Sequence, residues 1–157
     1  MDNNANQPHK SSVGIEANKT VIIMYIIISI LFWVSYIKYF AWLIPVLFFI
    51  IEKKSKFVKY NAVQGFFIGV IRAVISLLLK LIGDAIALKD LSGIMSYDVK
   101  NRWISAAMLP GEIDVFIGIG FIVFVLVLII KSIDYARVSV PGIGDIASTL
   151  SKLSDDE

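Results

Sequence analysis

The chain has 157 residues, of which 57% are hydrophobic and 18% charged, and it contains no cysteine. Soluble domains have about 45–50% apolar and about 25% charged residues, and small domains bury proportionally less of their chain. The excess apolar surface therefore predicts contact with lipid. Disulfides, thiolate metal sites and a cysteine nucleophile are excluded. The formal net charge of +2 is too balanced to indicate nucleic-acid binding.

Residues 1–19 are polar and show no apolar periodicity, which predicts a disordered tail. The segment lacks the compact basic region of a signal peptide, and no small-residue cleavage site follows the next apolar run. The single histidine, His9, lies in this tail. One histidine without partners does not indicate a metal or catalytic site, so we expect no cofactor.

The first apolar block runs from Val21 to Ile51 and contains one charge, Lys38. As one helix it would be about 46 Å long, whereas the hydrocarbon core of a bilayer is about 30 Å thick. Pro45 removes a helical hydrogen bond in its second half. Aromatic residues cluster around the lysine, as at a membrane surface: Trp33, Tyr36, Tyr39 and Trp42. A hairpin of 21–37 and 39–51, with Lys38 at one interface, is favoured over one tilted, kinked helix.

The loop Glu52–Tyr60 is the densest basic segment of the chain. Its four lysines stand against one acid: Lys53, Lys54, Lys56 and Lys59. Short basic loops stay on the cytoplasmic side, so this loop is expected inside. Two further spans, 61–82 and 113–131, then lead outward and back, which places the C-terminal tail 132–157 in the cytoplasm. In the hairpin alternative the N-terminus is also inside, and in the kinked-helix alternative it is outside.

Between the last two spans, Asp84–Glu112 carries charges throughout and cannot cross a bilayer. We expect an amphipathic helix on the outer surface, anchored by Trp103. The predicted fold is thus all-α: a polytopic integral membrane helical bundle with about four membrane-embedded helices in 20–131 and this external segment. The predicted location is the cell membrane, with multiple passes.

Four polar residues recur at multiples of four along the span 61–82 and form an intramembrane polar stripe: Gln64, Arg72, Ser76 and Lys80. An arginine deep in a bilayer costs at least about 2.5–3.5 kcal/mol, so it usually faces protein or water. The topology makes Glu112 and Asp114 the candidate counter-charges. The stripe either lines a polar cavity or a partner contact, with Arg72 as its central cation, or Arg72 forms one structural ion pair or snorkels. A single arginine favours the structural role. Gly65 and Gly69 form a small-xxx-small pair that allows close helix contact.

No arrangement typical of an enzyme is present. The serines outside the tail have no histidine to accompany them, and there is no Ser/His/Asp set, no HExxH and no P-loop. Paired carboxylates occur only at exposed ends. We therefore expect a protein without enzymatic activity.

Two motifs resemble those of a known family. The stretch FVKYNAVQ resembles a phrase that follows the basic turn in the Tic-twenty-like family of small bacterial membrane proteins, which are related to an import component of the chloroplast inner envelope. The stretch VPGIGDIA resembles the ending after the last span of the same family. The matching residues are Phe57, Val58, Lys59, Tyr60, Asn61, Ala62 and Gln64 in the first motif and Pro141, Ile143, Gly144 and Ala147 in the second. Lys59 replaces the commoner arginine, and Asn61 replaces a frequent histidine.

The resemblance covers roughly residues 40–147 and implies a helical membrane protein with about four embedded segments. Most bacterial members have no assigned function, so an import role is analogy alone. We expect the tail to pack against the basic turn, with Asp145 near Lys53 or Lys56, and Ile143, Ile146 and Leu150 to lie on the inner membrane surface.

Three functions fit these observations. The first is a non-enzymatic subunit or accessory that acts through helix contacts, related to protein translocation if the resemblance holds. The second is a small transporter or channel that oligomerises around the Arg72 stripe. The third is an immunity or stress-response membrane protein. The expected partners are the lipid bilayer and other membrane proteins or further copies of the chain, and no nucleic acid.

Overall fold

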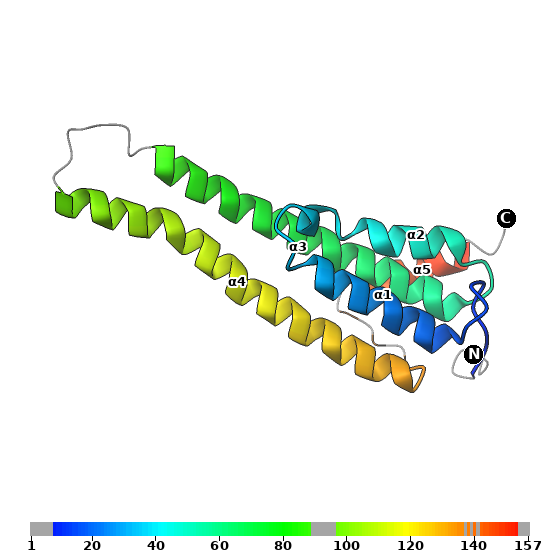
Figure 1. The fold of residues 1–157 in the computed structure, drawn as a ribbon. Coiled ribbons are helices and arrows are strands. Elements are labelled where there is room, and N and C mark those ends of the chain that lie inside the picture. The colour runs from blue at the N-terminus through cyan, green and yellow to red at the C-terminus, as the bar shows by residue number, and fades with distance from the viewer. Residues whose placement is uncertain (1–7, 89–96, 137, 139, 141, 154–157) are drawn as a thin grey trace.

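A computed structural model of the chain describes residues 8–88, 97–136, 138, 140 and 142–153. Apart from an isolated bridge between Lys10 and Glu16, these ranges contain no strand, and the predicted all-α class is confirmed. The helices are α1 (Ala17–Leu31), the 3-10 turn η2 (Ile37–Phe40), α2 (Leu43–Ile51), α3 (Lys56–Leu88), α4 (Tyr97–Ile133) and α5 (Gly144–Leu153). Figure 1 shows them as an elongated bundle built along α3 and α4.

The first apolar block folds as a hairpin and not as a single kinked helix. The helix stops after Leu31, and η2 reverses the chain before α2 begins. Ser12, just before α1, hydrogen-bonds to Glu52, just after α2, so the open ends of the hairpin lie together. α1 and α2 have 15 and 9 residues, or about 22 Å and about 14 Å, and neither reaches across about 30 Å of hydrocarbon.

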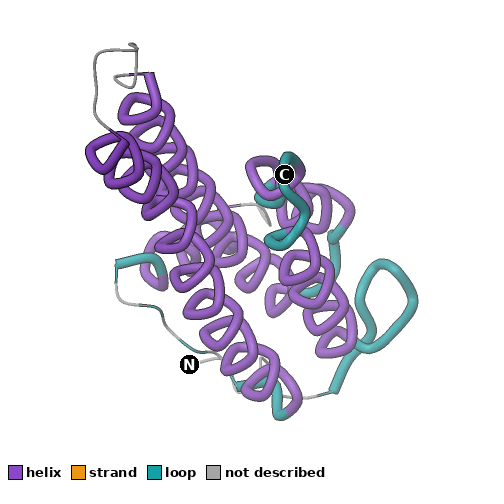
Figure 2. The backbone as a smooth tube through the Cα atoms, turned by 60° about the vertical axis from the view of Figure 1, so that its left-hand side comes forward, coloured by secondary structure: helices purple, strands orange, loops and turns teal. Residues whose placement is uncertain are grey.

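Two helices are long and apolar enough to cross a membrane, over Lys56–Ala87 and Met108–Ile133. Four full spans are therefore not seen. The C-terminal half of α3 and the N-terminal half of α4 project beyond the other helices (Figure 1, Figure 2).

The expected separate external helix over Asp84–Glu112 is not found. Residues 84–88 finish α3, and residues 97–112 begin α4 without a break before the predicted span 113–131. Charges exclude a segment from lipid, but they do not end a helix. Pro110 is also accommodated inside α4. The anchoring side chain proposed for this segment, Trp103, lies outside the described side chains.

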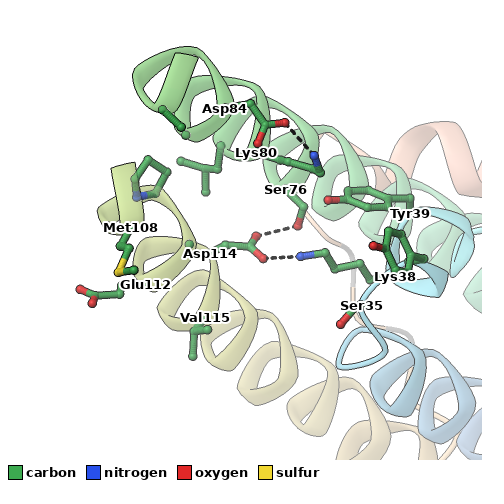
Figure 3. Close-up of a pocket in the computed structure, with 16 residues that line it drawn as sticks. Ser35, Lys38, Tyr39, Ser76, Lys80, Asp84, Met108, Glu112, Asp114 and Val115 are labelled. Carbon is green, nitrogen blue, oxygen red and sulfur yellow. Dashed lines mark hydrogen bonds and ion pairs between the residues drawn. The ribbon is translucent and has the colours of Figure 1, made fainter. Parts of the chain in front are cut away.

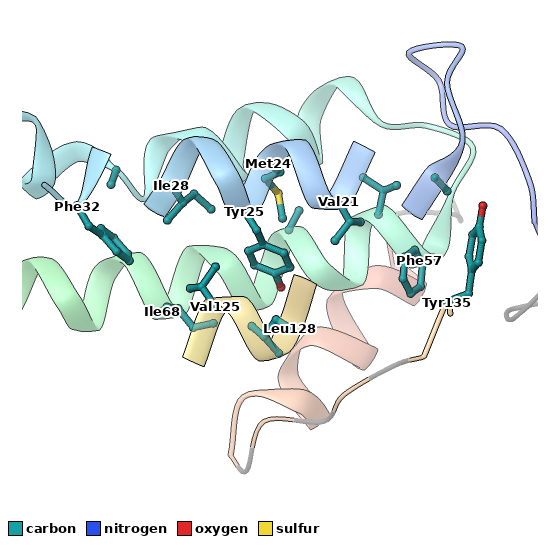
Figure 4. Packing of buried hydrophobic residues seen from close by; sticks show 14 residues of the cluster. Val21, Met24, Tyr25, Ile28, Phe32, Phe57, Ile68, Val125, Leu128 and Tyr135 are labelled. Carbon is teal, nitrogen blue, oxygen red and sulfur yellow. The ribbon is translucent and has the colours of Figure 1, made fainter. Parts of the chain in front are cut away.

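The core joins α1 to α3 and α4, as Figure 4 shows. Val21, Tyr25 and Ile28 recur at helical spacing on one face of α1 and are fully buried. The Tyr25 hydroxyl lies 3.3 Å from both the backbone and side-chain oxygens of Asn61. This core fixes the hairpin against the first half of α3.

The Gly65–Gly69 pair lets α2 approach α3 closely, as predicted. A Cβ atom at Gly69 would lie 2.8 Å from Cα of Trp42, and one at Gly65 would lie 3.1 Å from Cγ of Pro45. Because the contact at Gly69 is with backbone, a larger residue there would have to displace the hairpin.

The N-terminal segment is ordered from residue 8, contrary to the disorder predicted for 1–19; residues 1–7 lie outside the described part. Ser12 donates its amide and hydroxyl to the Glu52 carboxylate, which also accepts from the amides of Lys54 and Ser55. His9 Nε2 lies 2.7 Å from Oγ of Ser55. The polar composition of this segment thus reflects hydrogen bonding to the loop after α2.

Burial disfavours the charge on Glu52, but the hydrogen bonds from Ser12 and from the loop amides outweigh it and lower the pKa of this carboxyl below its usual value. The ionised carboxylate therefore holds the N-terminal segment against the loop between α2 and α3.

The C-terminal segment turns back along α3. The Val138 carbonyl accepts from Nε2 of Gln64 at 2.7 Å, and Ile143 lines an apolar groove of about 410 Å³ with Ile68. α5 then returns along α3, where Ala147 packs on Tyr60. The tail thus packs on α3 at Tyr60 and Gln64. Its predicted packing against the basic turn, with Asp145 near Lys53 or Lys56, stays a prediction.

Candidate functional site

Three helical elements bring charged side chains to one point inside the bundle. Arg72 lies near the middle of α3, Asp114 lies in α4, and Lys38 lies in η2 at the tip of the hairpin. Ser76 adds a hydroxyl one turn after Arg72 on the same face of α3. We call these four residues the charge cluster.

Asp114 is the centre of the charge cluster. Its Oδ1 accepts from Nη1 of Arg72 at 2.5 Å and from the Ser76 hydroxyl at 2.6 Å, and its Oδ2 accepts from Nζ of Lys38 at 2.7 Å. Nη2 of Arg72 also donates to the Asp114 carbonyl at 3.2 Å, and Nη1 contacts the Ser76 hydroxyl. Each oxygen of the carboxylate is therefore held by a cation.

The charge cluster carries two cations against one anion. The Arg72 side chain is 3% exposed, whereas that of Lys38 is 19% exposed. A buried charge is tolerated when it is paired and hydrogen-bonded. Arg72 donates to Asp114 twice, once to the carboxylate and once to the backbone carbonyl. Lys38, the more exposed cation, is therefore the excess positive charge.

A glycine in α4 makes room for the arginine. A Cβ atom at Gly118 would lie 3.0 Å from Nη2 of Arg72. Gly118 lies one turn after Asp114 on the same face of α4. The guanidinium of Arg72 therefore binds the Asp114 carboxylate and occupies the space that a side chain at Gly118 would fill. The helical spacing thus seats Arg72 against α4 and not against lipid.

A cavity of about 680 Å³ lies beyond the hairpin tip, between the projecting halves of α3 and α4. Figure 3 shows Lys38, Ser76 and Asp114 at one end of it. Toward the other end, Lys80 pairs with Asp84 at 2.7 Å. Its lining residues are Ser35, Tyr36, Lys38, Tyr39, Ser76, Leu79, Lys80, Gly83, Asp84, Ala87, Met108, Pro110, Gly111, Glu112, Asp114 and Val115.

The predicted polar stripe divides into three separate environments. Gln64 binds the C-terminal segment through Val138, and Arg72 and Ser76 bind Asp114. Lys80 pairs with Asp84 on the half-exposed surface. Arg72 and Ser76 thus share one site, and Gln64 belongs to the packing of the tail.

Of the two candidate counter-charges, the structure pairs Asp114 with Arg72. Glu112 is exposed and lines the cavity, and Figure 3 shows its carboxylate pointing away from Lys38. Lys38 was expected at a membrane interface, and sequence reasoning missed it as a member of the cluster. The sequence signal for this role was that Lys38 is the single charge in the apolar block 21–51. A lysine there needs a buried anion if the hairpin tip stays inside the bilayer.

The residues of the two family-like motifs meet around α3. Phe57 and Val58 are buried in the core, Ala62 packs beside them, and Ala147 contacts Tyr60. Asn61 donates to the carbonyl of Phe57. Lys59, Ile143 and Gly144 lie in the same region, and Pro141 falls outside the described residues. The motifs therefore fix the C-terminal segment on α3.

Within the described ranges, the charge cluster supplies one carboxylate and two cations. These ranges contain no group of three or more His, Asp or Glu residues that could hold a metal ion. Comparisons with protein-family models, curated proteins and solved structures give no match for this chain.

Proposed function

We propose that the chain is a multi-pass membrane protein without enzymatic activity, which works as a subunit or accessory of a larger assembly through helix contacts. α3 and α4 cross the bilayer, and the hairpin of α1 and α2 enters it without crossing. The observation that carries this proposal is the uneven cover of the two long helices. The hairpin ends at the level of Arg72, and α3 continues for about 24 Å beyond that residue.

The projecting half of α3 exposes large apolar side chains around Leu78 and Leu81, each 54% exposed, and α4 exposes Met108 at 64%. Within the part of the chain that the structure describes, no helix covers these faces. A membrane helix of another protein would complete the bundle here by packing against them.

Site-specific crosslinking tests this proposal. A photoreactive residue at Leu81 is expected to yield one defined adduct whose protein also copurifies with the intact chain. The matched control is Ile30 on α1, which is 59% exposed but lies on the covered half of the bundle. Equal adducts at both positions, or lipid adducts alone at Leu81, would refute the proposal.

The charges favour one orientation. The start of α1 meets the end of α4 through Asn18 and the Ile133 carbonyl, and the basic loop containing the exposed Lys53 and Lys54 lies at this same end. By the positive-inside rule this end faces the cytoplasm, with both chain ends. The resemblance to the Tic-twenty-like family supports an assembly related to protein translocation.

A small transporter that uses the cavity is the second candidate. The volume of about 680 Å³ and the position of Lys38 at its inner end favour it. Flux of a small anion into proteoliposomes that disappears with Arg72→Leu, while the protein remains folded, would establish this function. Flux equal to that of empty liposomes would reject it.

A further inference from the structure

We propose that the cavity beyond the hairpin tip binds the anionic headgroup of a phospholipid, with Lys38 as the cation that contacts it. The inference rests on the membrane placement given above, but not on any protein partner.

The first support is the charge balance at the inner end of the cavity. Lys38 and Arg72 share the single carboxylate of Asp114. Lys38 makes one described ion pair, and its ammonium also lies 5.3 Å from the centroid of the Tyr39 ring. An ammonium has three donors, so the described contacts leave capacity for an anionic oxygen from the cavity side.

The second support is the arrangement of the other charges on the cavity. Lys80 and Asp84 neutralise each other at the rim, and Glu112 points away from Lys38 (Figure 3). The positive charge of Lys38 is therefore not cancelled by a second carboxylate facing it from these positions. A singly anionic group would bring the charge cluster to neutrality.

The third support is the surface around the cavity. Its walls belong to α3 and α4, whose outer faces beside the charge cluster are apolar on the hairpin side, with Ile71 42% and Ile119 45% exposed. A ligand that carries one phosphate and two acyl chains matches this combination, because the phosphate faces Lys38 and the chains cover the adjoining helix faces. A volume of about 680 Å³ is ample for a headgroup.

The test uses the purified full chain in a mild detergent, with lipid binding followed by native mass spectrometry. Phosphatidylglycerol is expected to bind about tenfold more tightly than phosphatidylcholine. Lys38→Met should remove this preference, because it deletes the contacting cation. The fold should persist in this variant, since the Arg72–Asp114 pair that remains is neutral.

Two control variants separate this contact from general attraction. Lys38→Arg keeps the charge and should keep the preference, and Lys131→Met, an exposed lysine at the opposite end, should leave it unchanged. Loss of the preference in Lys131→Met to the same extent, or its retention in Lys38→Met, would overturn the proposal.

A soluble anion distinguishes the two sources of a phosphate group. Glycerol 1-phosphate alone should bind far more weakly than phosphatidylglycerol, and equal affinity would reject a lipid as the ligand. Because no partner protein enters this measurement, failure of lipid selectivity leaves the crosslinking result at Leu81 to decide the proposed function separately.

Discussion

Asp114 is the residue on which the interior charges depend. Its carboxylate accepts from Arg72, Lys38 and Ser76, and it is the only anion in the charge cluster. Removing either cation leaves a neutral pair, whereas removing the anion leaves two buried like charges.

Asp114→Asn is therefore expected to destabilise the protein by about 3–5 kcal/mol, because it leaves buried cations without compensation. Lys38→Met should cost only about 1 kcal/mol, the scale of one hydrogen bond. The measurement is the unfolding midpoint in a titration with denaturing detergent, followed by helical circular dichroism. A larger effect from Lys38→Met than from Asp114→Asn would contradict the assignment of Asp114 as the centre.

Glu52 gives the N-terminal segment a pH dependence. Its pKa is lowered in the folded chain because hydrogen bonds to the carboxylate outweigh the effect of burial. The stabilisation is therefore complete above the ordinary glutamate pKa of about 4.3, and it is lost as the pH falls through the lower folded pKa. Wild type should have a higher thermal midpoint than Glu52→Gln near pH 7, and the difference should shrink below about pH 4. A constant difference across this range would rule out ionisation as the cause.

At the scale of the helical elements, the fit of α2 into α3 depends on Gly69. Gly69→Ala places a methyl group 2.8 Å from the Trp42 backbone, so the hairpin must shift, at a cost of about 1–3 kcal/mol. Gly120→Ala in α4 is the matched control, because nothing lies within 4 Å of the added atom. Gly69→Ala should have a lower midpoint of thermal unfolding in detergent than Gly120→Ala. Equal midpoints would show that the hairpin shifts without a cost in stability.

The sequence allowed some of these elements to be predicted and not others. The hairpin followed from the length of Val21–Ile51, and the approach at Gly65 and Gly69 followed from their spacing. The start of α4 at Tyr97 could not be found, because hydropathy reports where a helix meets lipid and not where it begins.

The residues of the charge cluster, too, could be predicted only in part from the sequence. Topology predicted Asp114 or Glu112 as the counter-charge, since the ends of two connected antiparallel spans must meet, but it did not choose between them. Lys38 could not be placed, because its depth depends on how far the hairpin enters, and the lengths of α1 and α2 were not evident from composition. The order of residues 8–16 depends on a contact with Glu52 across 40 positions of the chain, which no local pattern contains.

For the whole molecule, the hairpin predicts that both chain ends lie on one side of the membrane. Because the chain has no cysteine, single cysteines at Val13, Lys53 and Asp84 can be labelled in intact cells without background. Val13→Cys and Lys53→Cys should react only after the cytoplasmic face is opened, and Asp84→Cys should react from outside. Labelling of Val13→Cys in intact cells would overturn the proposed orientation.

The ion pair between Lys38 and Asp114 joins residues 76 positions apart, and this separation bears on how the chain is made. A ribosome completes the hairpin well before it adds Asp114, the carboxylate that pairs with Lys38. Until α4 is made, Lys38 lacks the carboxylate of Asp114, and moving its unpaired charge from water into the bilayer is unfavourable. The hairpin should therefore stay at the membrane surface and insert last. Biogenesis of this protein would then proceed against the order of its sequence, with its first helices seated after its later ones.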